Sequence, residues 1–253
     1  AAAMGVKPDK MHVLTTQVGG SFGMKGSVFP EYIALLHAAR DLKRSIKFTE
    51  MRSESFVSDH QGRDHDVDGE LALDADGNIL ALRMTGYANL GAYMTPFGVL
   101  IGAINIHRNA QSVYRTPVIA TKITCVLTNT PPIGAYRGAG RPEGNYVMER
   151  MIEEAARVSG IDSIALRKRN HIRPEELPFT TGVGSVYDSG EFTALLDAAL
   201  EAADYKGFGA RKAESVSRGK LRGIGVGQYL EITAPPTNEL GEIIFEEDGG
   251  VLM

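Results

Sequence analysis

The chain has 253 residues, of which 43% are hydrophobic and 23% charged, so its composition is that of a folded protein with room for one large domain or two small ones. The formal net charge of −4 gives no reason to expect a nucleic-acid partner. A single cysteine, Cys125, excludes an internal disulfide and a multi-cysteine metal site. Because the sequence lacks an apolar run of about 18 residues, we expect a cytoplasmic protein without a membrane span.

The first elements expected along the chain are a short strand over residues 12–15, a glycine-rich loop and a helix. The loop, Gln17–Gly26, has four glycines among its last eight residues, which lets the backbone approach a ligand closely or adopt positive φ. The helix is predicted to begin near Pro30, a residue type favoured in a first helical turn. Apolar side chains at spacings of three and four predict a core-facing stripe: Val28, Tyr32, Leu35, Ala39 and Leu42. A strand over residues 46–51 is expected next.

Residues 52–68 are polar and contain two histidines and several aspartates. A metal cluster built from His60, His65 and these aspartates is one interpretation. Neighbouring side chains on a strand point to opposite faces, so we favour a solvated loop that leads into a strand. The alternation that follows predicts an antiparallel hairpin with its turn over residues 74–78. Residues 87–116 have poor periodicity and are expected to form a long loop across a buried surface.

The centre of the sequence combines a strand, a glycine loop and a helix. The strand is predicted over residues 123–127 and the helix from near Pro142, with an apolar side made of Met148, Met151, Ile152, Ala155 and Val158. The loop between them carries Arg137 and Arg141 beside its glycines. Two guanidinium groups near a helix N-terminus favour an anion. Surface salt bridges are the alternative role for both arginines.

A glycine loop between a strand and a helix also suggests a dinucleotide-binding motif. Gly138 and Gly140 match the first two glycines of that motif, but Glu143 stands at the third position. A carboxylate there would lie close to the pyrophosphate. A nucleotide-binding dehydrogenase is therefore a less favoured alternative.

The C-terminal part is expected to add a helix over residues 190–203 and, from Gly223, the start of a second sheet with a hairpin turn at residues 248–250. Basic and small residues between them predict a linker. The fold class is α+β, with mixed and antiparallel sheets and packed helices. The chain divides into a first domain, a linker and the start of a second domain: residues 1–205, 206–220 and 221–253.

Two loops resemble motifs of one known family. Gly19–Lys25 resembles Gly-Gly-x-Phe-Gly-x-Lys, and Ala135–Gly140 resembles Ala-Phe/Tyr-Arg-Gly-x-Gly, of the molybdenum hydroxylases. That family comprises xanthine dehydrogenases, aldehyde oxidases and the large subunit of aerobic carbon monoxide dehydrogenase. The order and spacing of the motifs agree, as does the later segment Arg222–Glu231, so the resemblance covers essentially the whole chain. It implies a fragment of a molybdopterin-binding large subunit, with an N-terminally truncated first molybdopterin-binding domain and the beginning of a second.

The resemblance implies a role for individual loop residues. The cofactor would be molybdopterin with molybdenum, in the cytosine dinucleotide form, and the residues binding it would be Gly19, Gly20, Phe22, Gly23, Arg137 and Gly138. Arg137 would also be the catalytic residue of this chain. The substrate face would be lined by Ala139 and Gly140. The pterin would hold the metal, without ligands from protein side chains.

Departures from the family motifs bear on the substrate. Carbon monoxide dehydrogenases carry a copper-binding cysteine where this loop has Gly138, and Cys125 lies in the preceding strand. Xanthine oxidisers carry a glutamate and a phenylalanine at the positions of Gly26 and Ala139. The motifs therefore most resemble carbon monoxide dehydrogenase-like large subunits that lack the copper cysteine. We expect an aldehyde or an N-heterocycle to be oxidised with water as the oxygen source.

The resemblance also implies groups that these 253 residues do not contain. The general-base glutamate of the family lies further toward the C-terminus, and no glutamate in this sequence matches it, so the isolated chain is expected to be inactive. Iron–sulfur and FAD subunits are the expected partners, in a dimer of heteromers that acts on a small molecule. A noncatalytic scaffold or assembly fragment with the same fold is the main alternative.

Overall fold

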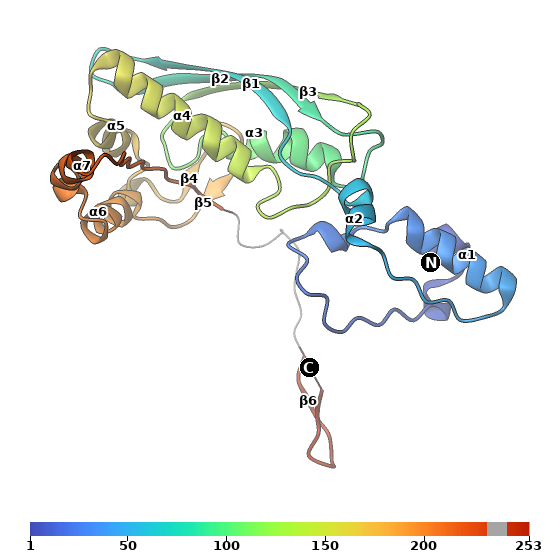
Figure 1. Cartoon of the computed structure of the whole chain (residues 1–253). Helices are drawn as coiled ribbons and strands as arrows, with labels where there is room; N and C mark the ends of the chain where they lie inside the picture. Colours follow the sequence, from blue (N-terminus) through green and yellow to red (C-terminus); the bar gives the residue numbers. More distant parts are fainter. Residues whose placement is uncertain (232–241, 253) are drawn as a thin grey trace.

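A three-stranded mixed sheet lies at the centre of the fold, in a computed structural model that describes residues 1–231 and 242–252 (Figure 1). Strands β1 (His65–Leu73) and β2 (Ile79–Asn89) are antiparallel, and β3 (Val118–Val126) pairs with β2 in parallel. The predicted hairpin is confirmed, because Asp74 Oδ1 in its turn accepts hydrogen bonds from the amides of Asp76 and Asn78 at 3.0 and 2.8 Å. The mixed and antiparallel sheets agree with the expected α+β class.

The long helix α4 (Arg141–Ser159) packs across this sheet and begins next to the predicted Pro142. Met148 and Ile152 are fully buried in the main core. The glycine at position 69 of β1 makes the approach possible, because a Cβ there would lie 2.5 Å from the Met151 sulfur. The predicted apolar side is wrong at Val158, which is 70% exposed in the last turn of the helix.

The N-terminal predictions hold only in part. Helix α1 (Pro30–Leu42) begins at the predicted proline, but residues 12–15 and 46–51 are not strands. The core-facing stripe is also wrong, because α1 has no buried residue and Val28 is 70% exposed. Figure 1 shows the reason: α1 lies beyond the short helix α2 (Arg52–Ser58), away from the central sheet. The apolar periodicity correctly predicted a helix, but it did not predict whether another part of the chain would cover the apolar side of that helix.

Residues 87–116 contain more regular structure than the long loop predicted for them. Strand β2 continues to Asn89, and a π-helix (Leu100–Ile104) runs directly into α3 (Asn105–Asn109). Ile101 and Ile106 are buried there, the latter in the same core as Met148. Such short helical pieces lack the periodic pattern that would have revealed them.

The C-terminal part packs three helices beside the sheet. Helix α5 (Ser163–Asn170) is capped by Asp162, whose Oδ1 accepts from the amide of Ala165 at 2.9 Å. Helix α6 (Phe192–Ala202) is close to the prediction, whereas the expected linker 206–220 contains helix α7 (Phe208–Ser217). The division into domains stays a prediction.

The remaining elements are small. Strands β4 (Phe179–Thr180) and β5 (Val186–Tyr187) form one antiparallel pair, and β6 (Ile244–Phe245) and β7 (Val251–Leu252) form the predicted C-terminal hairpin. Part of the expected second sheet falls on residues 232–241, outside the described residues. None of the helices in the described ranges has the length and apolar character needed to cross a bilayer. Five 3₁₀ turns complete these ranges: Ala2–Met4, Pro8–Lys10, Met24–Gly26, Pro174–Glu176 and Tyr205–Gly207.

Candidate functional site

The two glycine loops, more than a hundred residues apart in the sequence, are joined through their backbones. The amide of Arg137 donates a hydrogen bond of 2.9 Å to the carbonyl of Phe22. Gly23 also lies against the second loop, because a Cβ on it would be 3.1 Å from the carbonyl oxygen of Ala135. The fold thus brings together the two segments that the sequence singled out.

The first loop has a tight left-handed backbone. Gly20, Phe22 and Gly23 have φ of 98°, 52° and 97°. A Cβ at Gly20 would lie 2.9 Å from the Phe22 ring, so the glycine makes room for a ring that is itself 62% exposed. In the part of the chain that the structure describes, the amides of these three residues have no acceptor. The loop therefore presents backbone donors beside an exposed flat ring.

The second loop turns in the same way just before α4. Gly138, Ala139 and Gly140 have φ of 83°, 47° and 95°. Asn105 stabilises the strained middle residue by donating from Nδ2 to the carbonyl of Ala139 at 2.8 Å. Gly140 is buried, and a Cβ on it would overlap the carbonyl of Ile101. The π-helix and α3, which were not predicted, are the elements that hold this loop in place.

Replacing Gly140 by alanine is expected to destabilise the chain by about 1–3 kcal/mol, because the side chain meets both an unfavourable φ and a backbone carbonyl. Gly160, the C-cap of α4, provides the matched control: its φ is 74°, but a Cβ there has no neighbour within 4 Å. Chemical denaturation of the two alanine variants measures the difference. Equal losses would show that the contact with Ile101 is unimportant.

A third segment, which the sequence did not identify, supports the second loop. Gln61 pairs with Ile133 in a parallel bridge, and its amide donates to Pro132 at 3.1 Å. The guanidinium of Arg63 lies 4.7 Å from the centre of the Tyr136 ring and donates to the carbonyl of Arg137. The sequence predicts a solvated loop at residues 61–63, and only their contacts with distant residues show that they support the second loop.

Six of the eight predicted site residues face two neighbouring cavities. One, of about 910 Å³, is lined by Gly19, Gly20 and Phe22 from the first loop and by Tyr136 from the second. The other, of about 810 Å³, is lined by residues of the second loop, α4 and the segment after α7, including Arg137, Gly138, Ala139, Tyr146 and Tyr229. The wall between the cavities is thus the Tyr136–Arg137 pair. Gly23 and Gly140 line neither cavity and shape the turns instead.

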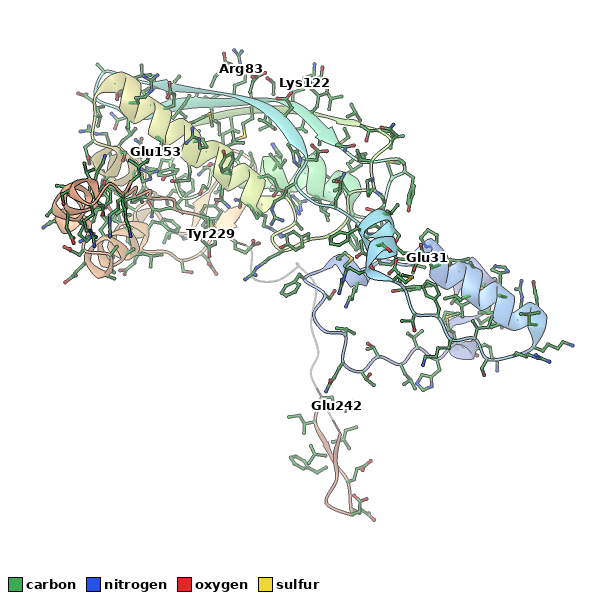
Figure 2. All side chains as sticks on the ribbon, in the orientation of Figure 1. Glu31, Arg83, Lys122, Glu153, Tyr229 and Glu242 are labelled. Carbon is green, nitrogen blue, oxygen red and sulfur yellow. The ribbon has the colours of Figure 1, made fainter. Side chains whose placement is uncertain are left out.

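The far wall of the second cavity is residues 226–231, an irregular segment held by side chains. Asn145 of α4 accepts from the amide of Leu230 at 3.3 Å and donates to its carbonyl at 3.2 Å, and Arg141 pairs with Glu231 at 3.1 Å. Figure 2 shows Tyr229 of this segment below α4. The cavity therefore has a fixed opposite wall, although the segment is not a regular strand.

A buried ion pair holds the start of the same segment. Arg167 of α5 is completely buried and donates to Glu149 of α4 at 2.8 and 3.1 Å and to the carbonyl of Val226 at 2.9 Å. The other oxygen of Glu149 accepts from the hydroxyl of Tyr114. Burial and the neighbouring carboxylate raise the pKa of that phenol. The carboxylate of Glu149 is thus fully engaged and serves the structure.

His171 connects the network to α6 and to residue 228. Its ring stacks on Tyr114 with centroids 5.6 Å apart and shares hydrogen bonds with Thr193 at 2.8 Å and Gln228 at 2.7 Å. Burial lowers the pKa of this imidazole, against the opposing effect of the Gln228 hydrogen bond. The neutral ring is the form that the fold accommodates.

Stability is expected to fall as the pH is lowered from about 7.5 to about 5.5, because the unfolded chain then binds a proton at a histidine pKa near 6.5 that the folded chain refuses. The pKa of His60 is lowered by burial as well and adds in the same direction. His171→Asn should reduce the pH dependence of Tm, and the same change at exposed His12 should not. An unchanged slope in His171→Asn would contradict this assignment.

The histidines and the cysteine carry no metal site in the described ranges. No group of three or more His, Cys, Asp or Glu side chains there is placed to hold a metal ion. His60, one of the two histidines considered as ligands, stacks on Phe29 with centroids 4.7 Å apart. Cys125 is half-buried in β3, and burial raises the pKa of its thiol, which disfavours the nucleophilic thiolate.

A comparison with known protein families identifies the domain that contains the two glycine loops. The sequence profile of the molybdopterin cofactor-binding domain matches residues 1–171. The chain belongs to this family. The recognition of a molybdenum hydroxylase family from the two loops is therefore confirmed, and the chain contains a molybdopterin-binding domain of the kind found in large subunits of these oxidoreductases.

Individual relatives of this molybdopterin-binding domain agree. The chain is 34% identical over 240 residues to subunit gamma of the 6-hydroxypseudooxynicotine dehydrogenase complex of Paenarthrobacter nicotinovorans, covering 93% of this chain and 30% of that protein. It is 32% identical over 249 residues to the carbon monoxide dehydrogenase large chain of Hydrogenophaga pseudoflava, covering 95% and 30%. The crystal structure of quinoline 2-oxidoreductase from Pseudomonas putida 86 superimposes with a TM-score of 0.75 at 32% identity, over 80% of this chain and 26% of that one. The chain thus spans about 30% of the length of these curated relatives.

Proposed function

We propose that the chain forms one wall of the cofactor and substrate site of a molybdenum hydroxylase large subunit. The enzyme would oxidise an aldehyde or an N-heterocycle with water as the oxygen source. The observation that carries this proposal is the 2.9 Å hydrogen bond from the Arg137 amide to the Phe22 carbonyl, because it joins the two family motifs in space. The matched cofactor-binding domain supports it.

The two loops fit a cofactor that holds its own metal. They offer backbone amides without acceptors in the described structure, an exposed aromatic ring and a guanidinium, all suited to oxygen-rich and planar groups. They do not offer a set of metal ligands within the described ranges. The cofactor-binding set that we propose is Gly19, Gly20, Phe22, Gly23, Arg137 and Gly138.

When bound, the molybdenum–pterin group supplies the redox chemistry. The chain itself would shape the site and give it positive charge. Phe22 gives a flat wall, and the guanidinium of Arg137 stabilises negative charge that develops on the substrate. Ala139, with its small side chain, leaves the substrate face open. Gly140 would stand beside it on the substrate face, and its close contact with Ile101 holds the turn in place. The two glutamates that line the second cavity are both engaged, Glu149 by Arg167 and Tyr114 and Glu231 by Arg141, so we place the general base outside these residues.

We also propose the form of the cofactor and the partner subunits. The cofactor is proposed to be the cytosine dinucleotide form. Iron–sulfur and FAD subunits would carry the electrons away, in a cytoplasmic dimer of heteromers. The names of the relatives, a subunit gamma and a large chain, support assembly with other subunits.

Turnover by the whole subunit with its partners tests the proposal. Expressed in a host that makes molybdenum cofactor, the complex should oxidise aldehydes or N-heterocycles, whereas the 253 residues alone should not. Cofactor-free protein, or cofactor without turnover on either class, would favour a scaffold. Activity of the isolated chain with any aldehyde would contradict the proposed location of the base.

Titration with nicotinamide dinucleotides tests the nucleotide-binding alternative. No saturable binding is expected, because the Glu143 carboxylate lies in the first turn of α4, where a pyrophosphate would need a positive or neutral environment. Saturable binding that Arg137→Ala abolishes would support that alternative instead.

A further inference from the structure

We infer that the 810 Å³ cavity beside Arg137 selects planar aromatic substrates that carry a negatively charged group such as a carboxylate. The inference rests on the proposed function and names the substrate class of that site. Three features carry it: an excess of positive charge, aromatic side chains on two walls, and walls that are held in place.

The charges that line the cavity do not cancel. Five charged side chains, three arginines and two glutamates, line it: Arg63, Arg137, Arg141, Glu149 and Glu231. Arg141 pairs with Glu231, and Glu149 pairs with Arg167 behind the wall. In the described structure no carboxylate pairs with Arg63 or Arg137. Two guanidinium groups therefore remain to bind an anion.

Arg63 is held beside the cavity mouth before any ligand arrives. It lies over the Tyr136 ring and donates to the carbonyl of Arg137, so its position is set by the same loop that carries the second arginine. A guanidinium held in this way keeps donors for a carboxylate and loses little rotamer entropy on binding. Its side chain lies on the surface of the loop, within reach of solvent and ligand.

The aromatic character comes from opposite sides of the cavity. Tyr146 of α4 is 66% exposed and Tyr229 of the facing segment is 72% exposed, and both line the cavity. Figure 2 places Tyr229 beneath α4. Exposed rings on two walls, with the small residues Gly138 and Ala139 beside Arg137 on the loop side, suit a flat ring.

The distance between the walls is fixed by hydrogen bonds from two buried side chains. Asn145 ties Leu230 to α4, and Arg167 ties Val226 to α5. The cavity thus does not need to be assembled by the ligand, which favours discrimination by shape. A phosphate group is the other anion that two arginines bind, but the tyrosine rings would add nothing to its binding.

Calorimetric titration of the whole cofactor-loaded subunit tests the inference with matched probes. Pyridine-3-carboxylate and pyridine-3-carboxamide have the same ring and differ in charge, and we expect the acid to bind about tenfold more tightly. Arg63→Ala should weaken the acid about tenfold and the amide less than about twofold, and Arg63→Lys should recover part of the loss. The control is Arg108→Ala, an exposed arginine on α3 that lines neither cavity.

Two further measurements keep the inference testable if Arg63→Ala does not fold. Tyr229→Ala should weaken the acid and the amide equally, by about fivefold, because the ring contact is lost for both. Propionate and pyrophosphate should bind much more weakly than the aromatic acid. Equal binding of acid and amide, or tighter binding of propionate or pyrophosphate, would overturn the inference. A retained preference in subunit without pterin would support the inference and contradict the proposed function.

Discussion

Replacing Arg167 by methionine is expected to lower the free energy of unfolding by about 3–5 kcal/mol, the largest effect of any substitution considered in this chain. The guanidinium is completely buried and bonds Glu149, Glu153, Ser163 and Val226, so its loss leaves the Glu149 carboxylate buried without its charge partner. Chemical denaturation measures the loss. Faster hydrogen exchange in residues 226–231 should accompany it, because Val226 loses its donor.

Two controls separate this effect from a general effect of removing arginine. Arg157→Met breaks an exposed pair with Glu154 and is expected to cost less than about 1 kcal/mol. Adding Glu149→Gln to Arg167→Met should restore more than half of the stability, because it removes the unpaired charge and keeps an acceptor for Tyr114. A double variant as unstable as the single one would show that packing, and not charge, dominates the site.

Replacing Arg137 by alanine is expected to lower kcat/KM of the assembled enzyme by about 100-fold, or about 2.7 kcal/mol of transition-state stabilisation. The guanidinium lines the cavity beside the proposed substrate face, and no ion pair engages it within the described structure. The backbone bond to Phe22 survives the substitution, because it uses the amide of residue 137. Cofactor content should therefore fall much less than kcat/KM.

The comparison variant for Arg137 is Arg150→Ala, an exposed arginine on α4, the helix that follows the second loop, and it lines neither cavity. Steady-state kinetics of both variants, normalised to molybdenum content, gives the result. Full activity of Arg137→Ala would remove the residue from the catalytic machinery. A fall in activity that matches a fall in cofactor would make it a cofactor-binding residue only.

Elements that carry their own local signal could be predicted from the sequence. The β1–β2 hairpin has a turn that bonds to its own Asp74, and α4 has both a proline in its first turn and a stripe of residues that contact the sheet. Each depends on residues close together in the chain. The C-terminal β6–β7 hairpin belongs to the same group.

Elements whose burial or exposure depends on distant parts of the chain could not be predicted in this way. The stripe of α1 has the periodicity of a buried face, yet the helix lies away from the sheet and buries none of its residues. The π-helix and α3 are fixed by burial of Ile101 and Ile106, which a non-periodic segment does not reveal. Tertiary contacts decide both outcomes.

The candidate site shows the same division. The motifs at Phe22 and Arg137 were found from their residue types, and the structure joins them. The residues that support the loop, Arg63 and Asn105, come from segments without any motif and act through long-range contacts. The sequence also could not predict that the two loops line different cavities. This arrangement depends on the directions in which Tyr136 and Arg137 point, because Tyr136 lines one cavity and Arg137 the other.

The most direct test is the molybdenum and pterin content of the whole subunit, purified from a host that makes the cofactor. We expect about one molybdenum and one pterin per subunit. We also expect a large loss of both when Gly20 is replaced by valine, because a side chain there meets the Phe22 ring at an unfavourable φ. Gly219, with positive φ and open surroundings, is the matched position at which valine should spare the cofactor. A subunit that folds in that host without molybdenum or pterin would contradict the account.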